Sequence, residues 1–257
     1  MGSINYQTIR VRLQETLCFI QFYRPESGNT INKQLVKEFH QALDSCEQER
    51  TVIILEGLQD VFCMGADFQE IHDTVKDEAT PDNEAEALYD LWFRLATGPY
   101  ITIAHVKGKA NAGGVGFVSA CDIVLADNTA VFSLSELLFG LFPACVLPFL
   151  TRRIGFQKAN YLTLMTKPVT VTDAYNWGLV DAFEPNSESL LRVHLLRLRR
   201  LSKTAVADYK QYQLKLNPFL VQSRTAAVTA NKEIFSNVSN LKLISKYVET
   251  GKFPWES

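Results

Sequence analysis

Residues Lys107–Asp127, KGKANAGGVGFVSACDIVLAD, carry the strongest structural signal in this chain. They follow an apolar segment, residues 100–106, which is typical of a buried parallel strand. Gly113 and Gly114 lie where this strand gives way to a predicted helix, and Gly116 follows inside that helix. A helix start presents unpaired backbone N–H groups, and glycine allows a ligand to come close to them. The stretch therefore predicts a turn at which the backbone meets a ligand.

A second turn of the same design precedes it at Phe62–Asp67, FCMGAD, where an apolar strand again ends near a glycine and a helix begins. Each turn alone has an ordinary alternative, since short connections between strands and helices are common. If the two helix starts converge, however, their N–H groups form an oxyanion hole, which stabilises a developing negative charge.

The remaining segments indicate an α/β protein with parallel strands followed by a helical C-terminal portion. In chain order they are a β-hairpin over 9–23, a helix over 32–49, a strand over 51–55, a helix over 88–95, and strands over 123–126 and 130–134. From about Cys145 onward helices dominate. Thr172 is the predicted N-cap of one of them, and Gly178 is its predicted C-terminal glycine.

The composition fits a folded protein that binds neither nucleic acid nor membranes. The 257 residues are 47% hydrophobic and 21% charged with a net charge of -2, so we expect a packed core. No apolar run is long enough to span a bilayer and no signal-peptide pattern is seen, which favours a cytoplasmic location. The five cysteines form no CxxC pair and the four histidines no metal-binding cluster. We therefore expect reduced, mostly buried thiols and no metal.

A single glutamate stands out downstream of the second glycine turn. Glu136 ends the segment Phe132–Glu136, FSLSE, and precedes the apolar segment 138–143. A carboxyl group near apolar surroundings can have a raised pKa and act as a general acid or base. The alternative is a helix-start glutamate that forms a capping box with Ser133.

Five motifs along nearly the whole chain resemble the crotonase family, the enoyl-CoA hydratase/isomerase superfamily. Any one of them is weak, but their order and separations together are specific. The motifs are Arg24-Pro25 to Asn32 (family pattern RPxxxNxxN), Cys63–Asp67 ((A/S)GAD), Val106–Gly114 with Cys121–Ile123 (the second oxyanion turn and its helix), Ser135–Pro143 (PExxxGxxP) and Ala174–Val180 (AxxxGLV).

The resemblance implies an α/β fold with a crotonase-type β-β-α superhelix core over residues 1–195. It also implies a C-terminal helical region over residues 196–257 that serves trimerisation and covers the active site, in a homotrimer or a dimer of trimers. The family binds acyl thioesters and stabilises an enolate with two backbone N–H groups, which correspond here to those of Ala66 and Gly113. No cofactor is implied.

One departure from the family pattern narrows the expected chemistry. Hydratases of this family usually carry two glutamates; Gly116 occupies the first of these positions and Glu136 the second. A single carboxylate can take the α-proton and return it to a leaving hydroxide on the same face. Asp67 is the alternative second catalytic group, although a cap of the following helix is the simpler role for it.

This combination resembles a subgroup of the family, the dehydratase of polyketide β-branching cassettes. The resemblance implies a lyase that converts 3-hydroxy-3-methylglutaryl-ACP into 3-methylglutaconyl-ACP, with the substrate on the phosphopantetheine arm of an acyl carrier protein. HMG-synthase-like and decarboxylase enzymes of the cassette would be its partners. The alternative functions are the 3-methylglutaconyl-ACP decarboxylase of the cassette, a CoA-thioester hydratase or isomerase of the same fold, and a non-catalytic acyl-carrier-binding protein.

Further binding residues are predicted from charge and position alone. An acidic carrier protein could dock on a basic helical segment, although such a run is more often a solvated helix face. His72 or Lys109 could neutralise the substrate's distal carboxylate, and Tyr89 could face the acyl pocket, whereas Trp92 is expected to pack in the core. The candidate docking residues are Arg192, Arg197, Arg199, Arg200, Lys203 and Lys210.

Overall fold

The computed structural model describes residues 5–76 and 85–256, and its strands form two sheets. The larger sheet has six strands, of which the first two pair antiparallel and the others in parallel. In sheet order they are β1 (Ile9–Gln14), β2 (Leu17–Phe22), β3 (Val52–Glu56), β5 (Ile101–Val106), β7 (Ile123–Ala126) and β10 (Ala182–Phe183). The predicted hairpin and the predicted parallel strands are therefore confirmed.

After β3, β5 and β7 of the larger sheet, the chain enters a smaller sheet. Its order is β4 (Val61–Cys63), β6 (Lys109–Asn111), β8 (Val131–Ser133) and β9 (Val169–Thr170). Thus β3 leads to β4 and then to helix α2 (Phe68–Lys76), and β5 leads to β6 and then to helix α4 (Gly113–Ala120). This repetition is the β-β-α superhelix that the motifs imply.

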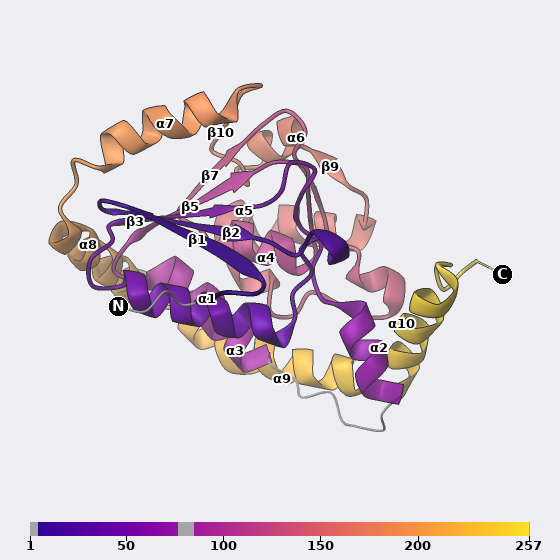
Figure 1. Cartoon of the computed structure of the whole chain (residues 1–257). Coiled ribbons are helices and arrows are strands. Elements are labelled where there is room, and N and C mark those ends of the chain that lie inside the picture. Colours follow the sequence, from indigo (N-terminus) through magenta and orange to yellow (C-terminus); the bar gives the residue numbers. More distant parts are fainter. Residues whose placement is uncertain (1–4, 77–84, 257) are drawn as a thin grey trace.

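Both faces of the larger sheet are covered, which explains why its parallel strands are continuous apolar runs. Helix α7 (Ser187–Leu198) covers one face with Leu190, Leu191 and Leu195 (Figure 1). The other face packs against α1 (Lys33–Cys46), α3 (Ala85–Thr97) and α4. Aromatic rings fill this second layer, and they belong to Phe22, Phe39, Phe62, Trp92 and Phe117.

Two helix starts show how local sequence positions these elements. Helix α1 follows Asn32, whose side chain accepts a hydrogen bond from the N–H of Leu35 at 2.9 Å. Helix α6 (Val171–Asn176) follows Thr170, so the prediction of Thr172 as its N-cap is wrong. The helix begins earlier than predicted because β9 ends at Thr170 and runs directly into it. The Thr170 hydroxyl accepts a hydrogen bond from the N–H of Asp173 and so caps the helix. Strands β6, β9 and β10 were not predicted, since two or three residues show no periodicity.

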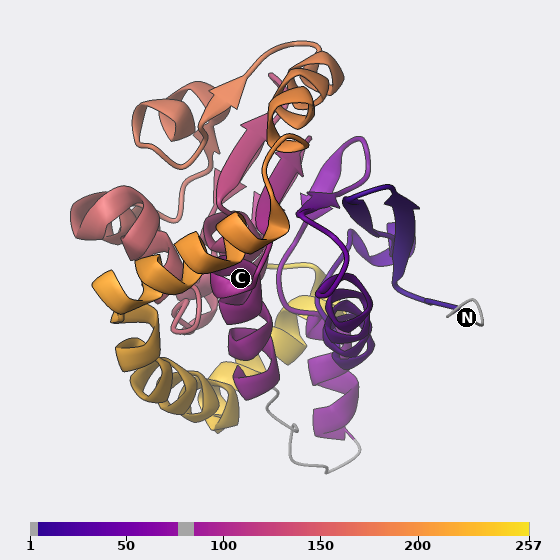
Figure 2. The same cartoon turned by 90° about the vertical axis from the view of Figure 1, so that its left-hand side faces the viewer.

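The remaining helices lie on the outside of the two sheets (Figures 1 and 2). They are α5 (Leu147–Met165), α8 (Lys203–Leu216), α9 (Phe219–Ser236) and α10 (Val238–Thr250). A buried ion pair joins α8 to the core, since the Lys210 ammonium lies 2.5 and 2.7 Å from the two carboxylate oxygens of Asp122. The prediction of Lys210 as a docking cation is therefore wrong, because its charge is already neutralised in the interior.

Helix α10 packs against α2 and against a short 3-10 helix, η2 (Glu136–Phe139). Aromatic rings make this contact, with Phe139 meeting Phe68 and Tyr247 at centroid distances of 5.1 Å each and Phe253 at 5.8 Å. The C-terminal helix is thereby held beside the first residue of η2, which is Glu136.

The cysteines are isolated thiols in the interior. All five are buried and unbridged, as the sequence predicts. Burial raises the pKa of the Cys63, Cys121 and Cys145 thiols to about 12, which suppresses thiolate formation. Within the two described ranges, no helix combines the length and the apolar character that crossing a membrane requires.

Candidate active site

The two glycine turns identified in the sequence lie against each other. Gly65 has φ +90°, and a Cβ atom placed on it would lie 2.6 Å from the Cβ of Ala112 and 3.2 Å from the nitrogen of Gly113. Any side chain at position 65 would therefore collide with the start of α4. The convergence that an oxyanion hole requires is present in the fold.

The backbone geometry leaves one N–H group available in each turn. A parallel bridge pairs Ile31 with Ala66, and it uses the Gly65 carbonyl at 2.7 Å and the Asp67 N–H at 3.0 Å. In such a bridge the N–H of the intervening residue, Ala66, points to the other side. Gly113 is the first residue of α4, and the first N–H of a helix has no partner within the helix. The two predicted oxyanion donors thus come from adjacent turns.

Asn111 joins both turns to the segment that carries Glu136. Its amide nitrogen donates to the Ser135 hydroxyl at 2.9 Å and to the Met64 carbonyl at 3.3 Å, and its amide oxygen accepts from the Ser133 hydroxyl at 2.7 Å. The next residue, Ala112, has φ +50°, a conformation that non-glycine residues rarely adopt. We infer that the Asn111 side chain holds this strained turn in place. The sequence analysis missed this role, and a polar residue ending a strand was its only signal.

Replacing Asn111 with alanine is expected to slow turnover by about 10- to 100-fold, because small displacements of positioned groups have effects of that size. The lost hydrogen bonds are also expected to lower the free energy of unfolding by about 1–3 kcal/mol. Steady-state kinetics and urea unfolding check both values. The matched control is Gln21→Ala, which removes one side-chain hydrogen bond, to the Gly57 carbonyl, on the hairpin. Equal losses of activity in both variants would contradict a positioning role for Asn111.

Glu136 is poised to exchange a proton near neutral pH. Burial raises the pKa of its carboxyl to about 7, and hydrogen bonds from the backbone N–H groups of Glu136 and Ser135 only partly oppose this. Its Oε2 atom is buried and has no hydrogen-bond partner among the described residues. The capping box with Ser133 is wrong, since the Ser133 hydroxyl bonds to Asn111 instead. A carboxyl group with this pKa suits a general base that later acts as an acid.

The position of the second glutamate is filled by a neighbouring ring. A Cβ atom on Gly116 would lie 2.5 Å from both Cζ2 and Cη2 of Trp92, and 2.9 Å from its Cε2. Trp92 is buried in the core, as predicted, with 1% of its surface exposed. Helices α3 and α4 therefore touch at Gly116, and any longer side chain there meets the indole.

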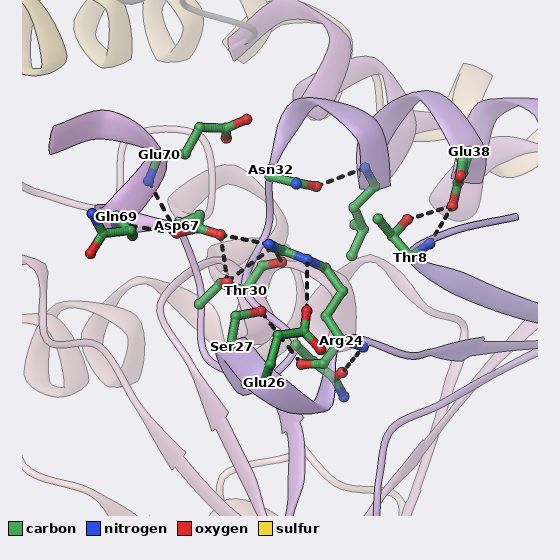
Figure 3. Close-up of polar contacts among 12 residues, drawn as sticks. Thr8, Arg24, Glu26, Ser27, Thr30, Asn32, Glu38, Asp67, Gln69 and Glu70 are labelled. Carbon is green, nitrogen blue, oxygen red and sulfur yellow. Dashed lines mark hydrogen bonds and ion pairs between the residues drawn. The ribbon is translucent and has the colours of Figure 1, made fainter. Parts of the chain in front are cut away.

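Asp67 has the cap role that the sequence analysis gives as the simpler one. One carboxylate oxygen accepts from the N–H groups of Gln69 and Glu70 at 3.1 and 3.3 Å, at the start of α2. The other lies 2.8 Å from the Arg24 guanidinium and accepts from the Thr30 hydroxyl at 3.0 Å (Figure 3). Both oxygens are thus engaged in holding the first oxyanion turn against the segment after β2.

Asp67→Ala is expected to destabilise the fold by about 3 kcal/mol, because it leaves the largely buried guanidinium of Arg24 with only the exposed carboxylate of Glu26, at 3.9 Å. In the folded fraction, the pH dependence of turnover should stay that of the wild type. Urea unfolding and a pH–rate profile measure the two effects. The double variant Arg24→Ala/Asp67→Ala should lose less stability than the sum of the single changes. Loss of the acid limb of the profile in Asp67→Asn would instead make Asp67 catalytic.

The three candidate pocket residues have different surroundings. His72 is buried on α2, and its Nε2 lies 3.7 Å from a carboxylate oxygen of Glu249 on α10. Tyr89 is fully buried and donates its hydroxyl hydrogen to the Leu220 carbonyl at 2.6 Å, so the structure places it in the core between α3 and α9 and not in a pocket. Lys109 is exposed on β6, two residues before Asn111.

The basic segment divides into exposed and engaged residues. Lys203 is partly buried, and its ammonium donates to the backbone carbonyls of Arg50 at 2.7 Å and Pro99 at 2.9 Å. The prediction of Lys203 as a docking cation is therefore wrong, because its donors are directed into the fold. The arginines of the segment are all exposed, and they are Arg192, Arg197, Arg199 and Arg200.

Comparisons with known proteins agree with this geometry. The chain is 58% identical over 257 residues to the bacillaene synthase dehydratase PksH of Bacillus subtilis (strain 168), covering 100% of this chain and 99% of that protein. A crystal structure assigned as a polyketide biosynthesis enoyl-CoA hydratase from Bacillus subtilis matches with a TM-score of 0.95 at 57% identity, over 97% of this chain and 100% of the other. An enoyl-CoA hydratase from Bacillus halodurans, at 22% identity, shares the fold with a TM-score of 0.83, over 93% of this chain and 100% of the other.

The family assignment rests on sequence and structure together. The model of the enoyl-CoA hydratase/isomerase family matches residues 12–257, which is nearly the whole chain. The adjacent glycine turns, the glutamate on η2 and every strand except the first residues of β1 lie within that matched region. The chain therefore belongs to the enoyl-CoA hydratase/isomerase family, the family that its five motifs indicate.

Proposed function

We propose that this protein removes water from 3-hydroxy-3-methylglutaryl-ACP and forms 3-methylglutaconyl-ACP in polyketide β-branching. The observation that carries the proposal is Glu136, a carboxyl with a pKa of about 7 beside the paired oxyanion turns, in a site where Trp92 fills the second glutamate position. The identity of 58% to a bacillaene synthase dehydratase supports the reaction type.

The chemistry follows from the weak acidity of a thioester's α-proton. The Glu136 carboxylate removes that proton, and the N–H groups of Ala66 and Gly113 stabilise the enolate oxygen. The enolate then reforms the carbonyl as the bond from C3 to its hydroxyl breaks. The leaving hydroxide takes the proton from Glu136 and departs as water. Because one carboxyl serves both steps, the elimination is syn, and no second carboxylate is needed.

The partners follow from the same proposal. The acyl carrier protein delivers the substrate on its phosphopantetheine arm, so the protein needs no cofactor of its own. The exposed arginines Arg197, Arg199 and Arg200 would dock this acidic partner, in a cytoplasmic cassette with HMG-synthase-like and decarboxylase enzymes. An apolar surface between α5 and α9, which includes the exposed Phe156 and Phe219, supports a homotrimer or a dimer of trimers.

The alternatives make different demands on Glu136. A decarboxylase forms its enolate by releasing carbon dioxide and needs no base for that step. A non-catalytic carrier-binding protein has no use for the buried Glu136 oxygen that finds no partner in the described residues, because such an oxygen is costly to maintain. A CoA-thioester hydratase or isomerase would use the same residues, and carrier preference alone separates it from the proposed enzyme.

The test is mass spectrometry of the purified chain with 3-hydroxy-3-methylglutaryl-ACP. Loss of one water from the acyl group is expected. Loss of carbon dioxide from 3-methylglutaconyl-ACP instead would assign the decarboxylase activity, and faster turnover of the CoA thioester would assign a CoA-dependent enzyme. The absence of any turnover with an intact carrier substrate would leave only the non-catalytic role.

A further inference from the structure

Trp92 contributes one edge of its indole to the space around α4. Its Cζ2 atom lies near both glycines, at 2.5 Å from the Cβ position of Gly116 and 3.8 Å from that of Gly113. Gly113 carries one of the two proposed oxyanion donors, and Gly116 occupies the position of the second glutamate. The same edge of the ring therefore borders both features of the site.

The indole nitrogen of Trp92 lacks a hydrogen-bond partner among the described residues. This nitrogen, Nε1, is buried and is bonded to Cε2, which lies 2.9 Å from the Cβ position of Gly116. The N–H group is thus one bond away from a ring atom that the β-carbon of a glutamate at position 116 would contact. Buried N–H groups nearly always have a partner, so an orphaned one at a candidate active site requires an explanation.

Packing alone does not require a tryptophan here. The ring neighbours of Trp92 are aromatic and apolar, with Phe117 at a centroid distance of 5.7 Å and Phe149 at 5.8 Å, both edge-to-face. A phenylalanine can make contacts of the same kind without burying an N–H group. The indole nitrogen therefore adds something that the core does not use.

We propose that the Trp92 Nε1–H donates a hydrogen bond to the 3-hydroxyl oxygen of the substrate as that oxygen leaves. This inference rests on the proposed dehydration and adds a second catalytic residue to it. As the bond between C3 and oxygen breaks, its electron pair goes to oxygen, which becomes hydroxide and then takes the proton from Glu136. The indole N–H stabilises the charge on that oxygen and keeps its own hydrogen.

The donor chemistry of indole fits this role. Indole N–H donates but does not accept, so it cannot compete with Glu136 for the α-proton. Both proton steps remain with Glu136, and the leaving oxygen still has a fixed donor in a site shielded from water. Gly116 is then the complement of Trp92, since any side chain there would displace the indole ring that carries the N–H.

The test replaces the N–H group and keeps the ring shape. In Trp92→3-benzothienylalanine, a sulfur atom stands in place of the indole N–H. Dehydration of 3-hydroxy-3-methylglutaryl-ACP is expected to slow about 100-fold, the typical loss for one donor to a developing charge. The control substrate is 3-methylglutaryl-ACP, which has no hydroxyl and can only exchange its α-proton in deuterated water. Its exchange rate should equal that of the wild type.

Two controls complete the experiment. Trp177→3-benzothienylalanine places the same analogue at a partly buried position after α6 and should keep wild-type dehydration. Glu136→Gln should lose both dehydration and α-proton exchange. Unchanged dehydration in the Trp92 analogue would overturn the inference, and so would a parallel loss of dehydration and exchange, which would indicate a packing role. Failure of the wild type to dehydrate the substrate would instead refute the proposed function itself.

Discussion

Glu136→Gln is expected to lower the rate of dehydration by about 10³-fold, within the range that positioned acid–base groups contribute. Glutamine has nearly the same shape but cannot carry a proton between the α-carbon and the leaving hydroxide. Carrier-bound product counted by mass spectrometry measures the effect. The matched control is Glu233→Gln, an exposed glutamate of α9, which should keep full activity. A fully active Glu136→Gln variant would rule out Glu136 as the base.

The raised pKa of Glu136 makes this prediction depend on pH in two ways. Turnover by the wild type should fall about tenfold for each pH unit below about 7, because the base must be ionised. The effect of pH on folding stability is opposite to its effect on turnover. Burial disfavours the ionised carboxylate, so the contribution of Glu136 to stability is fully present below pH 4.5 and is lost as pH rises through about 7.

Glu136→Gln should therefore be more stable than the wild type at alkaline pH while being nearly inactive. The pKa of Glu136 rises from 4.5 to about 7, and each tenfold change in ionisation is worth about 1.4 kcal/mol, so the gain above pH 8 approaches about 3 kcal/mol. Urea unfolding at pH 5 and pH 8.5 measures it. Equal stability of the two proteins at both pH values would mean that the carboxyl is not held in an unfavourable environment.

Gly116→Glu, which restores the second glutamate of the family pattern, is expected to destabilise the protein by about 4 kcal/mol or more. The new Cβ would lie 2.5 Å from two atoms of the rigid Trp92 ring, and overpacking of this kind alone costs about 1–3 kcal/mol. Moving the added carboxylate out of water into the core would cost further free energy. Thermal and urea unfolding of purified protein, or its loss to the insoluble fraction, measures the result.

A double-mutant cycle separates the clash from the buried charge. Trp92→Ala alone is expected to cost about 3–5 kcal/mol through the cavity that it leaves. In the double variant the glutamate can enter that cavity, so the combined loss should be smaller than the sum of the two single losses. Additive losses would show that the ring and residue 116 do not share the same space, as would wild-type stability in Gly116→Glu.

Much of the fold followed from local pattern. The hairpin over β1 and β2 and the helix after Asn32 appear in the sequence as alternation and helical spacing, and the structure has them within a few residues. Both glycine turns were predicted because Gly65 and Gly113 lie where an apolar strand ends and a helix begins. The structure adds that a side chain at Gly65 would collide with Ala112. Glu136 was identified by its position near an apolar segment, and its raised pKa confirms that environment.

Other features depend on segments that are distant in the chain. The contact of Asp67 with Thr30, the ion pair of Lys210 with Asp122 and the hydrogen bond of Tyr89 to Leu220 join residues between 37 and 131 positions apart. Charge and spacing identify such residues as possible site groups, but only their tertiary partners distinguish a cap or a core contact from a binding role. Two of the proposed docking cations, Lys203 and Lys210, were misassigned for this reason.

The chain thus contains two kinds of information about its site. Family, superhelix and the two turns are encoded locally, because glycine, apolar runs and helix starts constrain the backbone wherever they occur. The reason why position 116 carries no glutamate lies in a tertiary contact. Gly116 signals an absent side chain, but only the packing of α3 on α4 shows that Trp92 fills its place, since close packing allows one occupant per volume.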